Sequence, residues 1–274
     1  MRFNEVVFLI LLGSLFLRLS FASTQPILEI IFFGGYFLFS LWLYLTEENV
    51  EKKRIKSILP IVSVPLIYFS LSHVMKILDP PNQDHLLQKA DELLVGGNLS
   101  LPLQSIAHPV LTECMYIAYL WFFAYVICSL IQQFRRGEMI RQSFYTGLFT
   151  IYWIGFLGYS WVPALGPYLM NHLGGPVLDG LYLTRPIYEL ILCSNNQVDV
   201  FPSLHCSISA FCLFFDWNYN RSRFWLYLPL CVLIWISTIY LGYHYFIDIV
   251  VGFGLTFLAL KLSKRDFLKT SCGF

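Results

Sequence analysis

The residues best suited to chemistry in this chain are two histidines and an aspartate. His205 closes the stretch 201–205 (FPSLH), and His244 and Asp248 close the stretch 240–248 (YLGYHYFID). Each stretch borders an apolar run long enough to enter a membrane, where ionisable groups are costly and are therefore usually functional. The i, i+4 spacing of His244 and Asp248 predicts that both lie on one face of a helix. There the carboxylate would hold one imidazole nitrogen and leave the other free to react.

Two such imidazoles suit phosphoryl transfer. One neutral ring attacks phosphorus, and a second, protonated ring gives its proton to the departing alkoxide. Asp248 would fix the tautomer of His244 and stabilise the cation that forms on attack. Ser203 follows a proline and is a good N-cap for a helix whose free N–H groups, beside His205, suit a phosphate oxygen. A three-ligand metal site is the alternative, but Asp248 is better spaced to hold its own histidine, so we predict no metal and no cofactor.

The composition indicates an integral membrane protein. Of 274 residues, 57% are hydrophobic and only 13% are charged, whereas soluble domains carry roughly 25% charged residues. The mean hydropathy is +0.63. A net charge of +1 argues against a nucleic-acid partner. The seven cysteines form no CxxC motif and no common zinc spacing, so we interpret most as small packing residues and leave a disulfide between Cys193 and Cys206 open.

We expect an all-α, polytopic membrane helical bundle of about eight transmembrane helices. The apolar runs lie at 5–19, 27–45, 58–77, 109–130, 143–161, 203–215, 224–240 and 243–262. A cleaved signal peptide is the alternative for the first run, but Arg18 sits badly before a cleavage site and favours a retained helix. The expected divisions are N-terminal transmembrane helices (1–78), a catalytic phosphatase-like membrane domain (79–262) and a cytoplasmic tail (263–274).

Two polar intervals separate these runs. In the first, 79–108, the segment 84–94 has helical periodicity and predicts a short amphipathic helix at the membrane surface. The second, 162–200, contains clusters of Gly and Pro that forbid one continuous helix. A long structured loop of this kind is usually functional.

The basic residues predict the orientation in the membrane. Cytoplasmic loops are rich in Lys and Arg, and the basic clusters fall in alternate connections, at 52–56, 135–141, 221–223 and 261–269. With about eight spans, all four lie on one side, which is then cytoplasmic. His205 and His244 both fall on the opposite, non-cytoplasmic face, as a joint active site requires.

The motifs resemble those of the type 2 phosphatidic acid phosphatase superfamily. PSLH at 202–205 is similar to its second motif and HYFID at 244–248 to its third, while PALGPY at 163–168 looks like a degenerate first motif. The closer likeness is to the inositol phosphorylceramide synthase branch, which has PSLH where the phosphatases have PSGH. The resemblance covers roughly 84–262. It implies that His244 is a nucleophile forming a phosphohistidine, that Asp248 is its partner, and that His205 is the acid on the leaving group.

The departures from the phosphatase pattern favour a diester substrate. Phosphatases of the superfamily carry Lys and Arg in the first motif and Arg at the place held here by Thr238, and none of these is matched. A monoester phosphate is nearly a dianion and needs several positive partners, whereas a diester is a monoanion and needs fewer. The residues expected to contact the substrate are Ser203, Gly166, Pro167, Tyr168 and Arg185, the last supplying one cation.

The preferred interpretation is a phosphotransferase that moves a phospho-head-group from a phospholipid, such as phosphatidylinositol, to a lipid alcohol such as ceramide. Its expected partners are these lipids and the bilayer. One alternative is a lipid phosphate or isoprenoid pyrophosphate phosphatase, with water as the acceptor. The other is a transporter or structural membrane protein that uses the histidines in a proton path.

Overall fold

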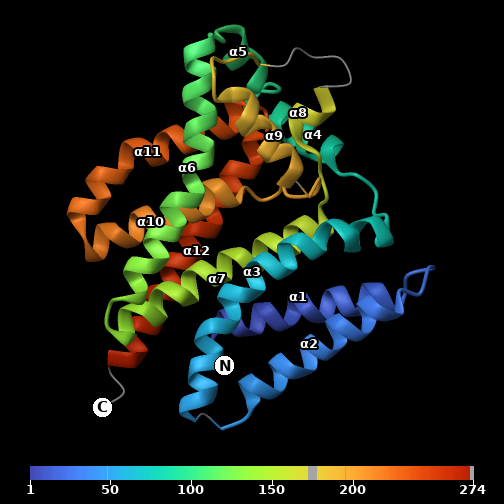
Figure 1. Cartoon of the computed structure of the whole chain (residues 1–274), viewed down its shortest axis with the longest axis vertical. Coiled ribbons are helices and arrows are strands. Elements are labelled where there is room, and N and C mark those ends of the chain that lie inside the picture. Colours follow the sequence, from blue (N-terminus) through green and yellow to red (C-terminus); the bar gives the residue numbers. More distant parts are fainter. Residues whose placement is uncertain (48, 172–177, 195, 272–274) are drawn as a thin grey trace.

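The computed structural model describes residues 1–47, 49–171, 178–194 and 196–271, and over these residues it contains helices and turns but no strand (Figure 1). The expectation of an all-α bundle is confirmed. The helices are α1 (Phe3–Ser20), α2 (Ile27–Leu45), α3 (Val50–Leu78), α4 (Asp84–Val95), α5 (Ser100–Ser105), α6 (Pro109–Phe134), α7 (Glu138–Trp161), α8 (Gly166–Asn171), α9 (Thr184–Ser194), α10 (Leu204–Tyr219), α11 (Arg221–Tyr240) and α12 (Phe246–Ser271).

Seven stretches of the described chain are helical, long enough and apolar enough to cross a membrane, and they correspond to α1, α2, α3, α6, α7, α11 and α12. The protein is therefore an integral, multi-pass membrane protein. The remaining expected span is α10, which has 16 residues and is about 24 Å long, shorter than a hydrocarbon core of about 30 Å. The last helix continues to Ser271, across the boundary at 263 that we expected for a separate tail.

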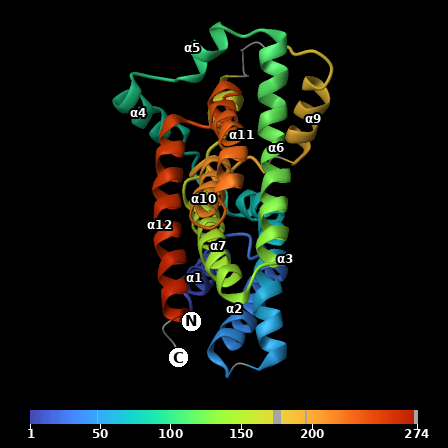
Figure 2. The same ribbon diagram turned by 90° about the vertical axis from the view of Figure 1, so that its left-hand side faces the viewer.

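The short helix α10 lies in the middle of the bundle. Figure 2 shows α6 and α12 on the two sides of α7, α10 and α11, and eleven of the 16 residues of α10 are buried. Two glycines of α7 permit this close packing. A Cβ at Gly155 would lie 2.5 Å from the Leu204 side chain, and one at Gly147 would collide with the Phe211 ring.

The first helix is part of the packed core. Leu11, Leu12 and Leu15 of α1 are completely buried, and α1 packs against α2 and α7. Near its C-terminal end, Arg18 donates from Nη1 to the Ser160 carbonyl of α7 at 2.6 Å. In this structure α1 therefore belongs to the bundle.

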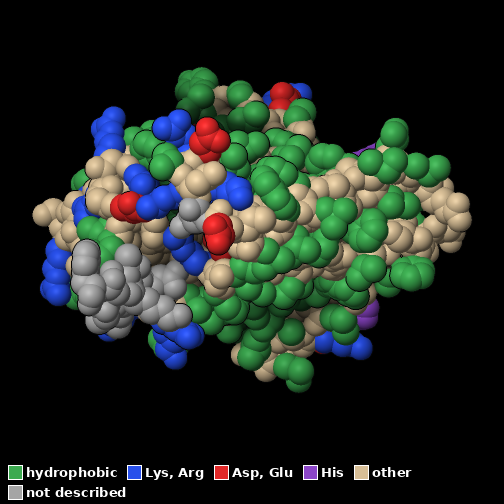
Figure 3. Space-filling model, turned by 90° about the horizontal axis from the view of Figure 1, so that it is seen from below, with side chains coloured by type: hydrophobic (Ala, Val, Ile, Leu, Met, Phe, Trp, Pro, Cys, Tyr) green, Lys and Arg blue, Asp and Glu red, His purple; other side chains and the backbone are tan. Residues whose placement is uncertain are grey.

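The basic connections lie together at one end of the bundle. Lys53, at the start of α3, forms an ion pair with Glu138 at the start of α7. Arg136, between α6 and α7, donates to the Tyr219 carbonyl at the end of α10, at 3.3 Å. Figure 3 shows Lys and Arg gathered toward one end of the molecule, with a largely hydrophobic surface beyond them. The first turns of α10 and α12 lie at the other end of the bundle, away from these basic residues.

The end of the bundle that holds the first turns of α10 and α12 is covered by the short helices α4, α5, α8 and α9 (Figure 1). The expected amphipathic helix is present as α4, which begins at Asp84 and ends at Val95. Helix α9 is held against α6 by Glu113, whose carboxylate accepts hydrogen bonds from the backbone N–H groups of residues 181–184. Buried acidic side chains thus fasten the short helices to the long ones.

Candidate active site

The start of α10 positions His205. As expected, Ser203 is the N-cap of this helix, and its hydroxyl accepts a hydrogen bond from the Cys206 N–H at 3.4 Å. The Ser203 N–H in turn donates to the backbone carbonyl of Asp248 at 3.1 Å. These contacts join the first turn of α10 to the first turn of α12, so the two sequence motifs are in direct contact.

His244 lies in the turn that precedes α12, and this corrects the expectation that it shares a helix with Asp248. The helix begins only at Phe246. The Nδ1 atom of His244 lies 2.8 Å from the backbone carbonyl oxygen of Val200, whereas the nearest oxygen of Asp248 is 3.5 Å away. That same Asp248 oxygen accepts from the Tyr245 N–H at 2.7 Å. The group that holds the histidine ring is thus primarily the Val200 carbonyl.

This arrangement determines which nitrogen of His244 can react. A carbonyl oxygen can only accept a hydrogen bond, so the proton of the neutral imidazole is assigned to Nδ1 and the lone pair to Nε2. Asp248 is completely buried, and its negative charge close to Nδ1 stabilises any positive charge that develops on the ring. Asp248 therefore acts on His244 mainly through its charge and through the turn that it caps.

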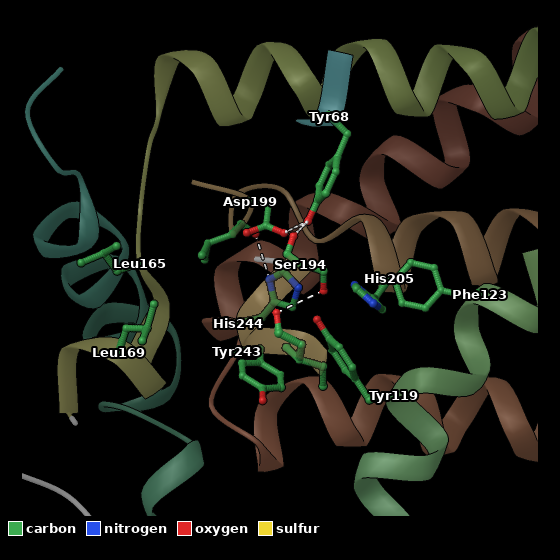
Figure 4. Close-up of a pocket in the computed structure, with 12 residues that line it drawn as sticks. Tyr68, Tyr119, Phe123, Leu165, Leu169, Ser194, Asp199, His205, Tyr243 and His244 are labelled. Atoms are coloured by element: carbon green, nitrogen blue, oxygen red, sulfur yellow. Dashed lines mark hydrogen bonds between the residues drawn. The ribbon is translucent and has the colours of Figure 1, made fainter. Parts of the chain in front are cut away.

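His205 is clamped by aromatic rings. Its imidazole stacks on Tyr119 with 4.2 Å between ring centroids, and it lies equally close to Phe122. Its Nε2 atom is buried and has no hydrogen-bond partner among the described residues. The ring centroids of His205 and His244 are 6.1 Å apart, and Figure 4 shows the two rings facing the same cavity. An unpaired, buried nitrogen at this place is suited to a ligand atom.

Both histidines line a cavity of about 50 Å³, which we call the histidine chamber. Its other lining residues include Tyr68 and Asp199, which the sequence analysis did not single out. The Tyr68 hydroxyl donates to Asp199 Oδ2 at 2.7 Å. Burial raises the pKa of the Asp199 carboxyl, while the Tyr68 hydrogen bond and the nearby His244 oppose that shift. No signal in the sequence pairs Tyr68 with Asp199, because 131 residues separate them.

A second cavity, of about 450 Å³, adjoins the chamber and lies between α3, α6, α7 and α10, and we call it the apolar groove. It is lined almost entirely by aliphatic and aromatic side chains. Tyr68, Phe123, Ser194, Asp199 and His205 line both the groove and the chamber. None of the described residues that line either cavity is Lys or Arg. The pair of cavities therefore places a largely apolar space next to two histidines and one carboxylate.

The predicted substrate contacts of the segment 163–168 have a packing role in this structure. Gly166 has φ +84°, and a Cβ there would lie 2.9 Å from the Tyr243 carbonyl oxygen. Pro167 is buried, and the Tyr168 N–H donates to the Gly242 carbonyl at 2.7 Å. From this part of the chain, Leu165 and Leu169 line the chamber.

Two further predicted residues lie away from the chamber. Arg185 is exposed and forms an ion pair with Glu189, one turn along α9, at 3.1 Å. The Ser203 hydroxyl is completely buried at its capping contact. Cys193 is exposed and Cys206 is buried, and both are free thiols, so the disulfide that the sequence left open is not formed.

Two aspartates of α4 fix the loops around the histidines. Asp84 accepts hydrogen bonds from the N–H groups of Leu165 and Gly166, at 2.7 and 2.9 Å, and from the Tyr245 hydroxyl, at 2.7 Å. Asp91 accepts from the first two N–H groups of α12, at 2.8 and 2.9 Å. Carboxylates at helix N-termini are stabilising because they satisfy free N–H groups and oppose the helix dipole. The segment predicted as a surface helix thus also anchors the turn that carries His244.

Comparison with known proteins agrees with this geometry. The chain is similar to an inositol phosphorylceramide synthase of Candida albicans (strain SC5314 / ATCC MYA-2876), with 25% identity over 230 residues. The similarity covers 77% of this chain and 48% of that protein, so the chain matches about half the length of its curated relative. No solved structure matches it. Residues 87–262, which include both histidine motifs, match the PAP2 superfamily, and the chain belongs to that superfamily.

Proposed function

We propose that this protein is a membrane phosphotransferase that moves a phospho-head-group, such as phosphoinositol, from a phospholipid to a lipid alcohol such as ceramide. Membership of the PAP2 superfamily places it among enzymes that act on lipid phosphates. The name of the Candida relative supports the finer assignment. Within the chain, the observation that carries the proposal is that the histidine chamber and the apolar groove adjoin and share five lining residues, His205 among them.

In the first step, His244 would act as the nucleophile. Its Nε2 lone pair attacks the phosphorus of the donor, and the bond between phosphorus and the diacylglycerol oxygen breaks. His205, protonated on Nε2, gives that proton to the departing oxygen. The products are diacylglycerol and a phosphohistidine that still carries the head group. Asp248 and the Val200 carbonyl support the positive charge that forms on the His244 ring.

In the second step, the hydroxyl of the acceptor lipid takes the place that diacylglycerol has left. His205, now neutral, removes the hydroxyl proton while the oxygen attacks phosphorus and the bond to His244 Nε2 breaks. The phospho-head-group is thereby joined to the acceptor, and both histidines return to their starting protonation states. The reaction conserves the number of phosphodiester bonds and needs no other reactant.

The absence of Lys and Arg from the described linings of both cavities supports a diester donor. A phosphomonoester carries nearly two negative charges, and sites that bind it supply several positive partners. A diester carries one negative charge and needs fewer positive partners. The only carboxylate that lines these cavities in the described chain, Asp199, adds further repulsion for a dianion.

The active site is proposed to open on the non-cytoplasmic face. The basic connections, which mark the cytoplasmic side in membrane proteins, are linked by Lys53–Glu138 and Arg136–Tyr219 at one end of the bundle. The histidines lie toward the other end. Labelling of cysteines placed in the two sets of loops, in sealed vesicles, tests this orientation.

The decisive experiment supplies the purified protein with radiolabelled phosphatidylinositol and with phosphatidate, each with and without ceramide. We expect release of diacylglycerol from the diester, an acid-labile phosphohistidine and transfer to ceramide. His244→Ala should abolish all three, with a loss of about a thousandfold or more, as for other covalent nucleophiles. Rapid release of free phosphate from phosphatidate without transfer to ceramide would instead establish the phosphatase alternative. Lipid turnover that persists in His244→Ala would exclude the proposed nucleophile.

A further inference from the structure

A hydrogen-bonded pair, Tyr68 and Asp199, lies where the histidine chamber and the apolar groove adjoin. We call this junction the neck, and it is formed by the residues common to both linings, Tyr68, Phe123, Ser194, Asp199 and His205. Two of the five are aromatic and one is the candidate acid–base histidine. Asp199 is the only carboxylate among them.

Asp199 is held in place from the far side of the groove. Tyr68 belongs to α3, which lies outside the matched range 87–262, and its hydroxyl donates to Oδ2 of Asp199 at 2.7 Å. Figure 4 shows both side chains above the His244 ring. An ionised carboxylate has about four acceptor positions, so the Tyr68 contact leaves capacity for bonds from a ligand. Asp199 is partly exposed and lines both cavities.

The position of the neck indicates which part of a lipid it meets. Under the proposed function, the hydrocarbon of the substrate lies toward the apolar groove, and its phosphate lies in the chamber beside the histidines. The neck then surrounds the polar backbone of the lipid, next to the reacting oxygen. A carboxylate there can only accept hydrogen bonds, so it favours a lipid that offers donors at this level and disfavours one that offers only oxygen acceptors.

We propose that Asp199, oriented by Tyr68, is a specificity-determining residue that selects an acceptor lipid whose reacting hydroxyl is flanked by a second hydrogen-bond donor, such as an amide N–H or another hydroxyl. This inference rests on the proposed function, which places the reacting oxygen beside His205. Ceramide has both kinds of donor next to its primary hydroxyl. Diacylglycerol has only ester oxygens there, so the product of the first step would be a poor acceptor in the second. Selection at the neck would therefore favour forward transfer over the reverse reaction.

The test measures lipid binding, which does not depend on turnover. The full-length protein in detergent is titrated with fluorescent ceramide and with fluorescent diacylglycerol of matched chain length. Wild type is compared with Asp199→Asn, which keeps the size and replaces one acceptor by a donor, and with Tyr68→Phe. Glu189→Gln, the same kind of change at an exposed acid of α9 outside both cavities, is the matched control.

We expect wild type and Glu189→Gln to bind ceramide more tightly than diacylglycerol. In Asp199→Asn the affinity for ceramide should fall about tenfold, as for the loss of one hydrogen bond to a charged group, with little change for diacylglycerol. Tyr68→Phe should show a smaller loss in the same direction. Equal losses for both lipids would show that Asp199 only holds the loop, and unchanged preference in Asp199→Asn would overturn the inference as well.

The outcome is separable from that of the proposed function. Phosphohistidine formation from phosphatidylinositol, measured without acceptor in wild type and in Glu189→Gln, tests the proposed function separately, because the first step does not use the acceptor. A protein that discriminates between the two lipids through Asp199 but forms no phosphohistidine would keep the selective site and refute the transferase reaction. A protein that transfers the head group to ceramide equally well with and without the Asp199 carboxylate would support the transferase reaction and refute selection by Asp199.

Discussion

Replacing Asp84 by Asn tests whether α4 holds together the segment 165–166 and the turn that carries His244. Asp84 is completely buried and accepts three hydrogen bonds, from Leu165, Gly166 and Tyr245. Asparagine has the same shape, but its amide nitrogen donates and cannot accept. One of the three donors must therefore face another donor, and the other two lose the negative charge of their partner.

The expected cost follows from these contacts. Leaving one buried N–H unsatisfied costs about 1–3 kcal/mol, and the exchange of two charge-assisted hydrogen bonds for neutral ones adds roughly 0.5–1 kcal/mol each, so the total is about 3 kcal/mol. For a chain of this size that loss lowers the unfolding midpoint by roughly 6–12 °C. The first effect on function should be a loss of activity with temperature, because the segment 165–166 and the turn with His244 separate before the long helices do.

The measurement is thermal unfolding of the purified protein in detergent, followed by tryptophan fluorescence, together with phosphohistidine formation at a temperature below both midpoints. Glu92→Gln is the matched control, because it makes the same chemical change at an exposed position of α4. We expect the control to unfold like wild type. A midpoint for Asp84→Asn within about 2 °C of wild type would refute the argument that this carboxylate fastens α4 to the active-site loops.

Three further perturbations follow from the same geometry. Gly166→Ala should lower the unfolding midpoint and the rate of phosphohistidine formation. The backbone at this position has φ +84° and the new Cβ meets the Tyr243 carbonyl, which costs at least about 1–2 kcal/mol of strain. A variant with the midpoint and rate of wild type would contradict this prediction. Asp91→Asn should weaken the cap of α12 by about 1 kcal/mol and speed hydrogen exchange at 246–247, and unchanged exchange would count against that contact. Burial raises the pKa of Asp199, so its carboxylate takes up a proton at a higher pH than an ordinary aspartate does. The preference for ceramide over diacylglycerol should therefore fall as the pH is lowered through that raised pKa. A preference that stays constant over the acid range in wild type, or that varies identically in Asp199→Asn, would contradict the last prediction.

The sequence by itself determined the class of the protein and the start of α10. Apolar runs separated by polar intervals predict membrane helices because an exposed backbone cannot be satisfied in lipid, and seven of the eight predicted runs correspond to candidate spans of the described chain. Ser203 was recognisable as an N-cap because capping is a local interaction. The two histidine motifs were likewise local in sequence and specific to a superfamily, which the match over residues 87–262 confirms.

What the tertiary structure decided are the contacts between segments far apart in the chain. The i, i+4 spacing of His244 and Asp248 suggested a shared helix, but α12 starts at Phe246, because Asp91 caps its first N–H groups from α4. The partner of the His244 ring is then a backbone carbonyl, at Val200, and no residue type in a sequence marks which carbonyl will be used.

The sequence did not predict Asp199, the second carboxylate of the site, for the same reason. Asp199 becomes a neck residue only because α3, α6 and α10 enclose one cavity and bring Tyr68 within 2.7 Å of it. Local patterns thus specified the helices and the two histidine motifs. The packing of those helices specified which polar groups surround the reacting atoms, since hydrogen-bond partners 44 and 131 residues apart are set by the three-dimensional arrangement of the chain.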